Sequence, residues 1–180
     1  METLIGLLAV TGMRIGEVIR LDLTDLDWAD GLLTVRSSKF GKSREVPLHP
    51  SAVTALRSYS DHRRRMGSRV RTTAFFVSTF GERLNYSSVH RTFHRLVRQL
   101  GLQSQSPRHS PRLHDLRHTF AVRTLLDWYR HGADVGQRLH LLSTYLGHVD
   151  PSATYWYLSA APELMALAAE RLESVDGELS

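Results

Sequence analysis

Apolar residues recur along this chain mostly at the spacing of an α-helix, and only short stretches have the character of a β-strand. The helical spacing predicts helices over 2–10, 14–20, 51–65, 86–100, 114–130 and 134–146, and a last one in PELMALAAERLES (162–174). LLTVRS (32–37) and REVPL (44–48) flank a turn and predict a hairpin, with Pro47 at a sheet edge or a strand end. AFFVS (74–78) predicts another short strand. The pattern therefore indicates an α+β, mostly α-helical fold with a small antiparallel β-sheet.

The helix predicted over 86–100, with Asn85 or Ser87 as its N-cap, is the clearest amphipath in the chain. Its apolar face carries Val89, Phe93, Leu96, Val97 and Leu100, and its basic face carries Arg91, His94, Arg95 and Arg98. A basic helix face either enters a DNA groove or is ordinary solvated surface. Arg91 and Arg95 are accordingly candidates for DNA contact.

The helix predicted over 114–130 begins with a cluster of basic side chains in the sequence LHDLRHTF (113–120). On a helix His114 shares a face with Arg117 and with His118, so the cluster could grip a metal ion or donate hydrogen bonds to a phosphate. The start of a helix favours an anion and disfavours a metal cation. Phosphate is therefore the better interpretation.

Composition supports an anionic partner. The 180 residues carry a formal net charge of +5, the sequence pI is about 10.0, and the basic residues gather in HRRRMGSRVR (62–71), HRTFHRLVR (90–98) and RHSPRLHDLRH (108–118). There is no cysteine, which excludes disulfides and thiolate sites. No apolar run approaches the roughly 20 residues of a membrane span, so a soluble protein is expected, and the lack of cysteine favours an intracellular, cytoplasmic setting.

Five short sequences, taken together, resemble the catalytic domain of the tyrosine recombinases, the phage integrase family. They are TGMRIGEVIRL with Arg14, KFGKSREVPL with Lys39, HDLRH with His114 and Arg117, LGH with His148, and TYWYLS with Tyr157. The order Arg, Lys, His-x-x-Arg, His, Tyr is complete, and the resemblance runs from about residue 2 to residue 175.

The resemblance implies a set of roles. In the family a tyrosine attacks the scissile phosphodiester and leaves a 3′-phosphotyrosine and a free 5′-hydroxyl. Two guanidiniums, here Arg14 and Arg117, match the charged non-bridging oxygens of the transition state. By the family pattern Lys39 is the general acid, His114 a proton acceptor or phosphate donor, and His148 a further hydrogen-bond donor.

Several positions have a competing interpretation. Glu17 is either a simple helix-surface partner of Arg14 or, as in the family, the acid that holds the arginine in place. Lys42 is a DNA-backbone contact or a plain turn residue, since the KxxKxRxVPL pattern gives the catalytic role to Lys39. Tyr155 and Tyr157 could each be an ordinary packing residue, and the spacing from His148 selects Tyr157 over Tyr155 as the nucleophile. His118 is expected to be a helix-packing histidine without a role in the chemistry.

The resemblance also sets expectations for partners and domains. We expect double-stranded DNA as the partner, a homotetramer on DNA with a monomer possible when free, association with the bacterial nucleoid, and no membrane. No metal and no cofactor are expected, because His114 and His118 are too few ligands for zinc. Residues 1–180 correspond to the catalytic domain alone, without the N-terminal core-binding (SAM-like) domain of full-length members, so the chain is a fragment or a natural minimal form.

The predicted activity is site-specific cleavage and rejoining of DNA. The stretch DWYRHGADVGQRLHLLSTYLGH (127–148) is longer than in common members and resembles integrases of mobile elements, which favours integration or transposition. Two alternatives stay open at this stage: DNA relaxation like that of a type IB topoisomerase, and a non-catalytic DNA-binding accessory protein. The last predicted helix docks either within its own chain or on a neighbouring subunit.

Overall fold

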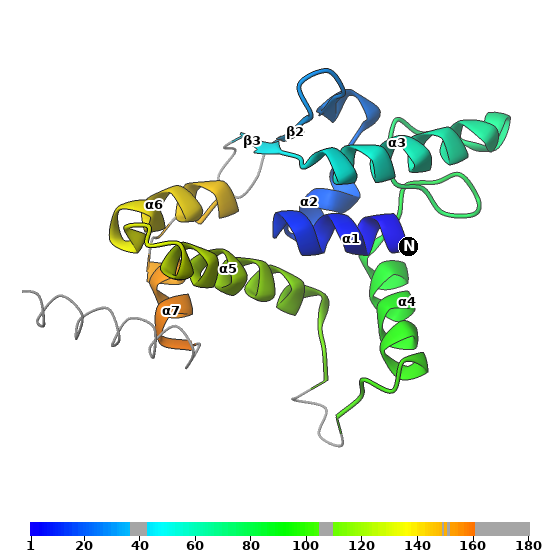
Figure 1. Ribbon diagram of the computed structural model, residues 1–180. Helices are drawn as coiled ribbons and strands as arrows, with labels where there is room; N and C mark the ends of the chain where they lie inside the picture. The colour runs from blue at the N-terminus through cyan, green and yellow to red at the C-terminus, as the bar shows by residue number, and fades with distance from the viewer. Residues whose placement is uncertain (37–42, 105–109, 149, 151, 161–180) are drawn as a thin grey trace, which may run out of the picture. The chain divides into compact units, whose positions relative to one another are not determined.

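The computed structural model describes residues 1–36, 43–104, 110–148, 150 and 152–160. The chain divides into two compact units, Met1–Arg117 and His118–Ser180 (Figure 1). The helix α5 (Leu113–Arg130) begins in the first unit and continues into the second. Residues proposed from the sequence as functional therefore fall in both units.

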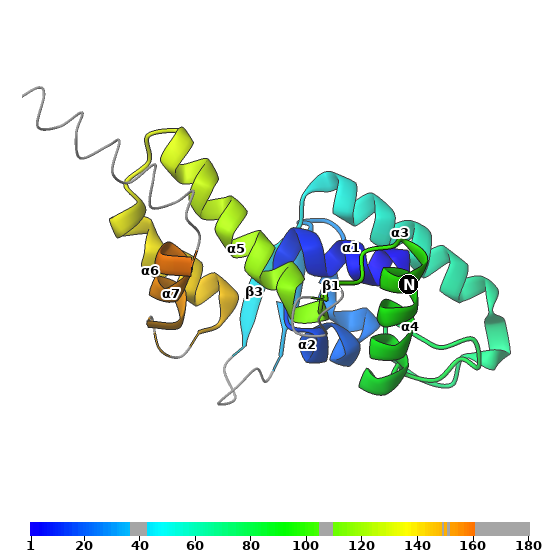
Figure 2. The ribbon, with the colours of Figure 1, turned by 90° about the horizontal axis from the view of Figure 1, so that it is seen from below.

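Helices make up most of the first unit. They are α1 (Glu2–Thr11), α2 (Ile15–Arg20), α3 (Pro50–Arg65) and α4 (Tyr86–Gln99), with short 3-10 turns η1 (Leu23–Asp25) and η3 (Gly67–Arg69). The helices α1 and α3 lie side by side in both views (Figures 1 and 2). Asn85 caps α4 by accepting a hydrogen bond at Oδ1 from the Ser88 backbone N–H (2.8 Å), which confirms one of the two predicted caps.

The sheet of the first unit has three antiparallel strands in the order β1 (Leu26–Asp27), β2 (Leu32–Val35) and β3 (Arg44–Pro47). Leu33 pairs with Val46, and both side chains are fully buried, so one face of the hairpin packs on the core. Pro47 ends β3 at the edge of the sheet, as predicted. The two-residue strand β1 was not predicted, because it is too short to show alternation.

The strand predicted over 74–78 is wrong. The segment makes only isolated bridges, Asp22 with Ala74 and Val77 with Arg83. Its backbone groups instead form hydrogen bonds with side chains of α3: Arg63 Nε donates to the carbonyl of Ala74 (3.0 Å), and the Val77 N–H donates to the Tyr59 hydroxyl (3.0 Å). Because Phe75 and Phe76 are adjacent and both buried, the segment also lacks the alternation of a half-buried strand.

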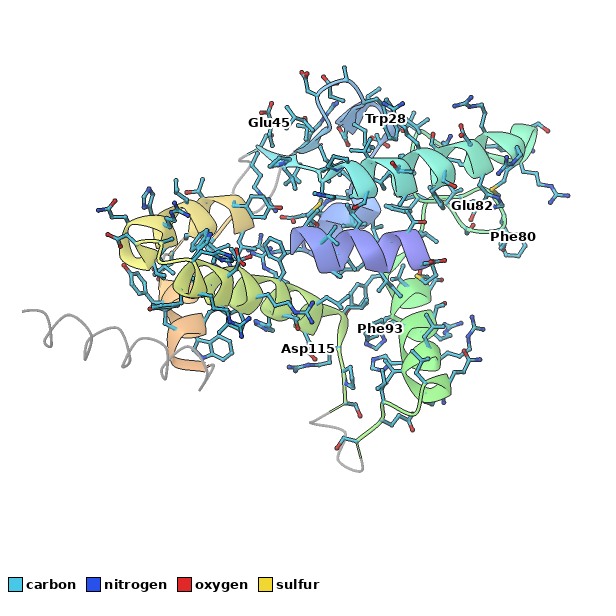
Figure 3. All side chains as sticks on the ribbon, in the orientation of Figure 1. Trp28, Glu45, Phe80, Glu82, Phe93 and Asp115 are labelled. Atoms are coloured by element: carbon cyan, nitrogen blue, oxygen red, sulfur yellow. The ribbon has the colours of Figure 1, made fainter. Side chains whose placement is uncertain are left out.

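The amphipathic pattern of α4 is largely confirmed. Val89, Phe93 and Val97 are buried, and Figure 3 labels Phe93 on this face. Leu100 is an exception, since it is the C-cap residue of the helix and is exposed. The apolar face therefore ends one turn earlier than its sequence indicates.

The second unit contains the rest of α5 together with α6 (Val135–Leu146) and α7 (Ser152–Ala160). These three helices share a core of Ala121, Leu125, Leu126, Val135, Leu139, Leu142, Leu146 and Tyr157. Asp134 caps α6 by accepting from the Gln137 N–H (3.0 Å), and Gly147 ends it in the left-handed conformation (φ 69°). Across the described ranges, none of the helices combines the length and the hydrophobicity needed to cross a bilayer.

Candidate active site

The turn between α1 and α2 places Arg14. Gly12 adopts the left-handed conformation (φ 61°) and its N–H donates to the Leu8 carbonyl (3.0 Å), which ends α1. Arg14 then stands in extended conformation as the N-cap of α2. About one third of its side chain (32%) is exposed to solvent, so a ligand can reach its guanidinium.

Glu17, the third residue of α2, is a buried carboxylate (4% exposed) that holds two arginines. Its oxygens accept hydrogen bonds from the backbone N–H of Arg14 (2.9 Å) and from Arg14 Nη1 (3.2 Å). Arg44, at the start of β3, donates from Nη1 to Oε1 (3.0 Å) and from Nη2 to Oε2 (2.9 Å). Glu17 is thus a buried anchor, and the simple helix-surface interpretation is wrong.

Burial alone raises the pKa of the Glu17 carboxyl, but the arginines reverse this effect. The hydrogen bonds from Arg44 and from the Arg14 backbone, together with both guanidinium charges, hold the pKa below its ordinary value of 4.5. The carboxylate is therefore charged at neutral pH and attracts both cations.

Replacing Glu17 with Gln is expected to lower the free energy of unfolding by about 3 kcal/mol at neutral pH, because two guanidiniums lose the buried carboxylate that balances their charge. The folded pKa lies below the unfolded one, so this stabilisation exists above about pH 4.5 and is lost as the pH falls through the folded pKa. Denaturant unfolding of wild type and Glu17→Gln at neutral pH and at about pH 3 should show the difference shrinking in acid.

The matched control is Glu45→Gln, which removes an exposed carboxylate beside Arg44 in the chain (Figure 3). It is expected to change stability by no more than about 0.5 kcal/mol at either pH. A Glu17→Gln effect that has the same size at both pH values would contradict the assignment of the stabilisation to the Glu17 charge.

The first turn of α5 carries His114 and Arg117. The Arg112 N–H donates to Asp115 Oδ2 (2.8 Å) and fixes where the helix begins; Asp115 is labelled in Figure 3. His114 is exposed in this first turn. Arg117, one turn later, is buried (2% exposed), and its Nη1 donates to the carbonyl oxygen of Gly12 (2.7 Å). Arg117 is thereby fixed to the turn that carries Arg14, two residues beyond Gly12.

In the second unit His148 lies next to α7 and is bonded to it. After Gly147 ends α6, the His148 N–H donates to the Ser143 carbonyl (2.9 Å). The His148 ring forms a hydrogen bond between Nδ1 and the Oγ1 of Thr154 (2.7 Å), and Thr154 is fully buried at the start of α7. Thr154 lies one turn before Tyr157, so this bond links His148 to the helix that carries the candidate nucleophile.

Tyr157 is buried (2% exposed) between aromatic rings of the second unit. The His148 ring stacks near it with a centroid distance of 6.2 Å, and the His118 ring meets it edge-on at 5.4 Å. His118 also contacts Trp156 (5.5 Å), in keeping with the packing role expected for it. Tyr155, by contrast, is exposed (58%) on the same helix.

The basic face of α4 is open to solvent. Arg91 and Arg95 are exposed, and Tyr86, His90 and His94 follow one another along the helix at successive turns. The Tyr86 ring stacks on the His90 ring (centroid distance 5.6 Å), and the Nε2 atoms of the two histidines are 3.0 Å apart. All of these side chains except His94, which is half-buried, are exposed.

Two of the predicted site residues, Lys39 and Lys42, lie outside the described residues. In the ranges that are described, no group of three or more His, Asp or Glu side chains could hold a metal ion. The sequence interpretation did not identify Arg44 or Thr154. The arginine of the KxxKxRxVPL pattern was a signal for Arg44, whereas nothing in the sequence marks Thr154.

Comparisons with known proteins point to one family. The phage integrase family profile matches residues 1–163. The protein y4rB of Sinorhizobium fredii, named as an integrase/recombinase, is 47% identical over 171 residues, which are 94% of this chain and 54% of that protein. Tyrosine recombinase XerC of Chlamydia caviae is 31% identical over 161 residues, covering 89% of this chain and 47% of XerC.

Solved structures show the same fold. The crystal structure of XerA recombinase matches with a TM-score of 0.74 and 27% identity, over 94% of this chain and 60% of that chain. The Tn1549 transposon integrase, in complex with transposon right end DNA, matches with a TM-score of 0.71 and 20% identity, over 95% of this chain and 58% of that one. The mostly helical fold with a small antiparallel sheet is thus confirmed, and the chain spans about half the length of the curated relatives it matches.

Proposed function

The chain belongs to the phage integrase family, and from this premise we propose that it is the catalytic domain, residues 1–180, of a site-specific tyrosine recombinase. It cleaves and rejoins double-stranded DNA through a 3′-phosphotyrosine intermediate. The substrate DNA belongs to a bacterial mobile element, which the recombinase integrates or transposes. Support for the last point comes from the long 127–148 segment and from the likeness of fold to a transposon integrase.

One observation carries the proposal: two guanidiniums are anchored to one turn. Arg117 bonds the carbonyl of Gly12, and Arg14, two residues further along, is held by the buried carboxylate of Glu17. Two fixed guanidiniums, each permanently charged and able to donate two parallel hydrogen bonds, suit the non-bridging oxygens of a phosphodiester better than they suit a metal ion or a carbonyl substrate. The pair therefore supports phosphoryl transfer.

The remaining residues complete the reaction. The Tyr157 oxygen attacks the scissile phosphorus, its proton passes to His114 or to solvent, and the bond to the 5′-oxygen breaks. Lys39 protonates the leaving oxygen to give a free 5′-hydroxyl, and His148 donates a hydrogen bond to the phosphate. In the reverse step a 5′-hydroxyl from the partner strand gives up its proton and attacks the phosphotyrosine, the bond from phosphorus to the Tyr157 oxygen breaks, and the tyrosine regains a proton. Side chains supply the charges and carry the protons in both steps, so no metal and no other cofactor is required.

The exposed fractions indicate what DNA binding must change. Arg14 is accessible, whereas Arg117 and Tyr157 are each 2% exposed. A tyrosine that is almost fully covered cannot attack a phosphate in a duplex. We therefore infer that DNA binding uncovers both groups before cleavage.

Covalent capture tests the proposal. The full chain is incubated with nicked duplexes that have a randomised central stretch, so that the short strand released by cleavage diffuses away and the adduct persists. After denaturation, DNA that stays attached to protein is sequenced, and the modified residue is mapped by mass spectrometry. An adduct on Tyr157 supports a recombinase, whereas DNA binding without any adduct would favour a non-catalytic DNA-binding protein.

Replacing both Arg91 and Arg95 with Ala is expected to weaken DNA binding and to lower the slope of log K against log salt by about two, because each lost phosphate contact releases one counterion fewer. The control removes the same charge from α3 with Arg64→Ala and Arg65→Ala, and it should leave the slope unchanged. Titrations of labelled duplex at several salt concentrations measure both. A slope that does not differ from that of wild type would exclude α4 as the DNA-contacting helix.

The chemistry also determines the assembly that we propose. Exchange of both strands between two duplexes requires four strand cleavages, and each chain supplies one Tyr157 that becomes covalently occupied. Four copies on DNA are therefore needed, while the free chain can be a monomer. The predicted docking helix (162–174) lies outside the described residues.

A further inference from the structure

We propose that Arg44 is a positioning residue, which fixes Arg14 through the shared Glu17 carboxylate and so couples the β2–β3 hairpin to the α1–α2 turn. The inference rests on the proposed function, because Arg14 is taken as a phosphate-binding residue. In this proposal Arg44 does not bind the phosphate or the reacting atoms and acts on the reaction through Glu17 and Arg14.

Arg44 occupies a special position in the hairpin. It pairs with Val35 in the last register pair before the connection between the two strands, and that connection contains Lys39. Arg44 is only 12% exposed, whereas Arg14 on the other side of the carboxylate is 32% exposed. The two arginines thus differ: Arg14 is the more accessible to solvent, and Arg44 is largely covered by the protein.

The geometry of the carboxylate ties the two together. Oε1 accepts from the Nη1 atoms of both arginines, at 3.2 Å for Arg14 and 3.0 Å for Arg44. Oε2 accepts from the Arg14 backbone N–H and from Arg44 Nη2, each at 2.9 Å. Arg44 therefore binds both carboxylate oxygens in a bidentate arrangement, which fixes the plane of the carboxylate. The orientation of this plane in turn determines where the Arg14 backbone N–H and side chain lie.

Charge gives Arg44 a second effect on Arg14. With Arg44 in place, the Glu17 charge is shared between two guanidiniums. Without it, the whole charge of the buried carboxylate would act on Arg14 and draw its guanidinium away from the position that the transition state requires. Loss of Arg44 should therefore impair the reaction of bound DNA more than the binding of DNA.

The test compares four variants in single-turnover cleavage of a duplex recovered by covalent capture. They are Arg44→Ala, Arg44→Lys, Glu17→Gln and the double variant Arg44→Ala with Glu17→Gln. The matched control is Arg36→Ala. Arg36 belongs to the same hairpin and also pairs with a buried carboxylate, but that carboxylate is Asp25 rather than Glu17.

Arg44→Ala is expected to lower the maximal cleavage rate constant about ten-fold or more, with the half-saturating DNA concentration nearly unchanged. Arg36→Ala should keep the wild-type maximal rate constant. Because Arg44 acts through Glu17, the double variant should be no slower than the slower of the two single variants. Arg44→Lys keeps the charge without the fork and should restore thermal stability but only part of the rate.

Three results would overturn the proposal: equal maximal rates for Arg44→Ala and Arg36→Ala, a double variant whose loss is the product of the single losses, or a loss confined to DNA affinity and its salt slope.

A measurement without DNA tests the coupling between Arg44 and Arg14 even if the wild-type chain forms no adduct. Such a missing adduct would refute the recombinase activity but not this coupling. Hydrogen exchange of the Arg14 backbone N–H should be faster in folded Arg44→Lys than in Arg36→Ala. Equal exchange would refute the coupling on its own.

Discussion

Replacing Tyr157 with Phe is expected to abolish the covalent adduct between the chain and DNA while leaving the chain folded and able to bind DNA. The change removes one oxygen, the only atom of the side chain that can attack phosphorus. Phe keeps the ring that packs near His148 and His118 in the second unit. Denaturing gels and mass spectrometry of the captured duplex measure the adduct, and a DNA titration measures binding.

The matched control is Tyr155→Phe, which removes the same oxygen from the same helix two residues away. Because Tyr155 is exposed rather than packed beside His148, its hydroxyl is the easier one for DNA to reach in the free chain. Exposure and family pattern therefore favour different tyrosines. An adduct that survives in Tyr157→Phe and disappears in Tyr155→Phe would show that the spacing from His148 had selected the wrong nucleophile.

Much of the fold was predictable because it depends on local pattern. The apolar face of α4, the cap at Asn85 and the end of β3 at Pro47 are all set by residues close in the chain. The segment 74–78 was mispredicted for the opposite reason. Its backbone groups form hydrogen bonds with Arg63 and Tyr59 of α3. These two residues lie outside any short sequence window around 74–78, so the local pattern could not reveal them.

The candidate site divides in the same way. The ordered motifs identified the residue types that the chemistry needs, so Arg14, Arg117 and Tyr157 could be proposed from the sequence. Glu17, three residues from Arg14, could be proposed as its support as well. The other supports could not, because they come from distant parts of the chain: the carbonyl of Gly12 is 105 residues from Arg117, and Arg44 is 27 residues from Glu17. The type and order of residues in the sequence thus indicate which groups react, whereas the groups that position them are determined by tertiary contacts.

Replacing either anchored arginine with Ala is expected to lower the maximal cleavage rate constant by about 10²- to 10³-fold, the usual cost of removing one donor to the charge of a transition state. The two variants should differ in stability. Arg14→Ala leaves Glu17 bound in the fork of Arg44 and should unfold close to the wild-type temperature. Arg117→Ala leaves the Gly12 carbonyl without its 2.7 Å donor and should lose about 2 kcal/mol, or about 6 °C in Tm.

This difference separates catalysis from folding. If the slow cleavage of Arg117→Ala came only from a loosened α1–α2 turn, then Arg14→Ala, which keeps that turn, would cleave almost as fast as wild type. If both guanidiniums bind the same phosphate, the two variants fall to similar rates although only one is destabilised. Single-turnover cleavage well below the Tm of both variants distinguishes the cases. A wild-type rate in Arg14→Ala would remove the paired guanidiniums as the basis of the proposed phosphoryl transfer.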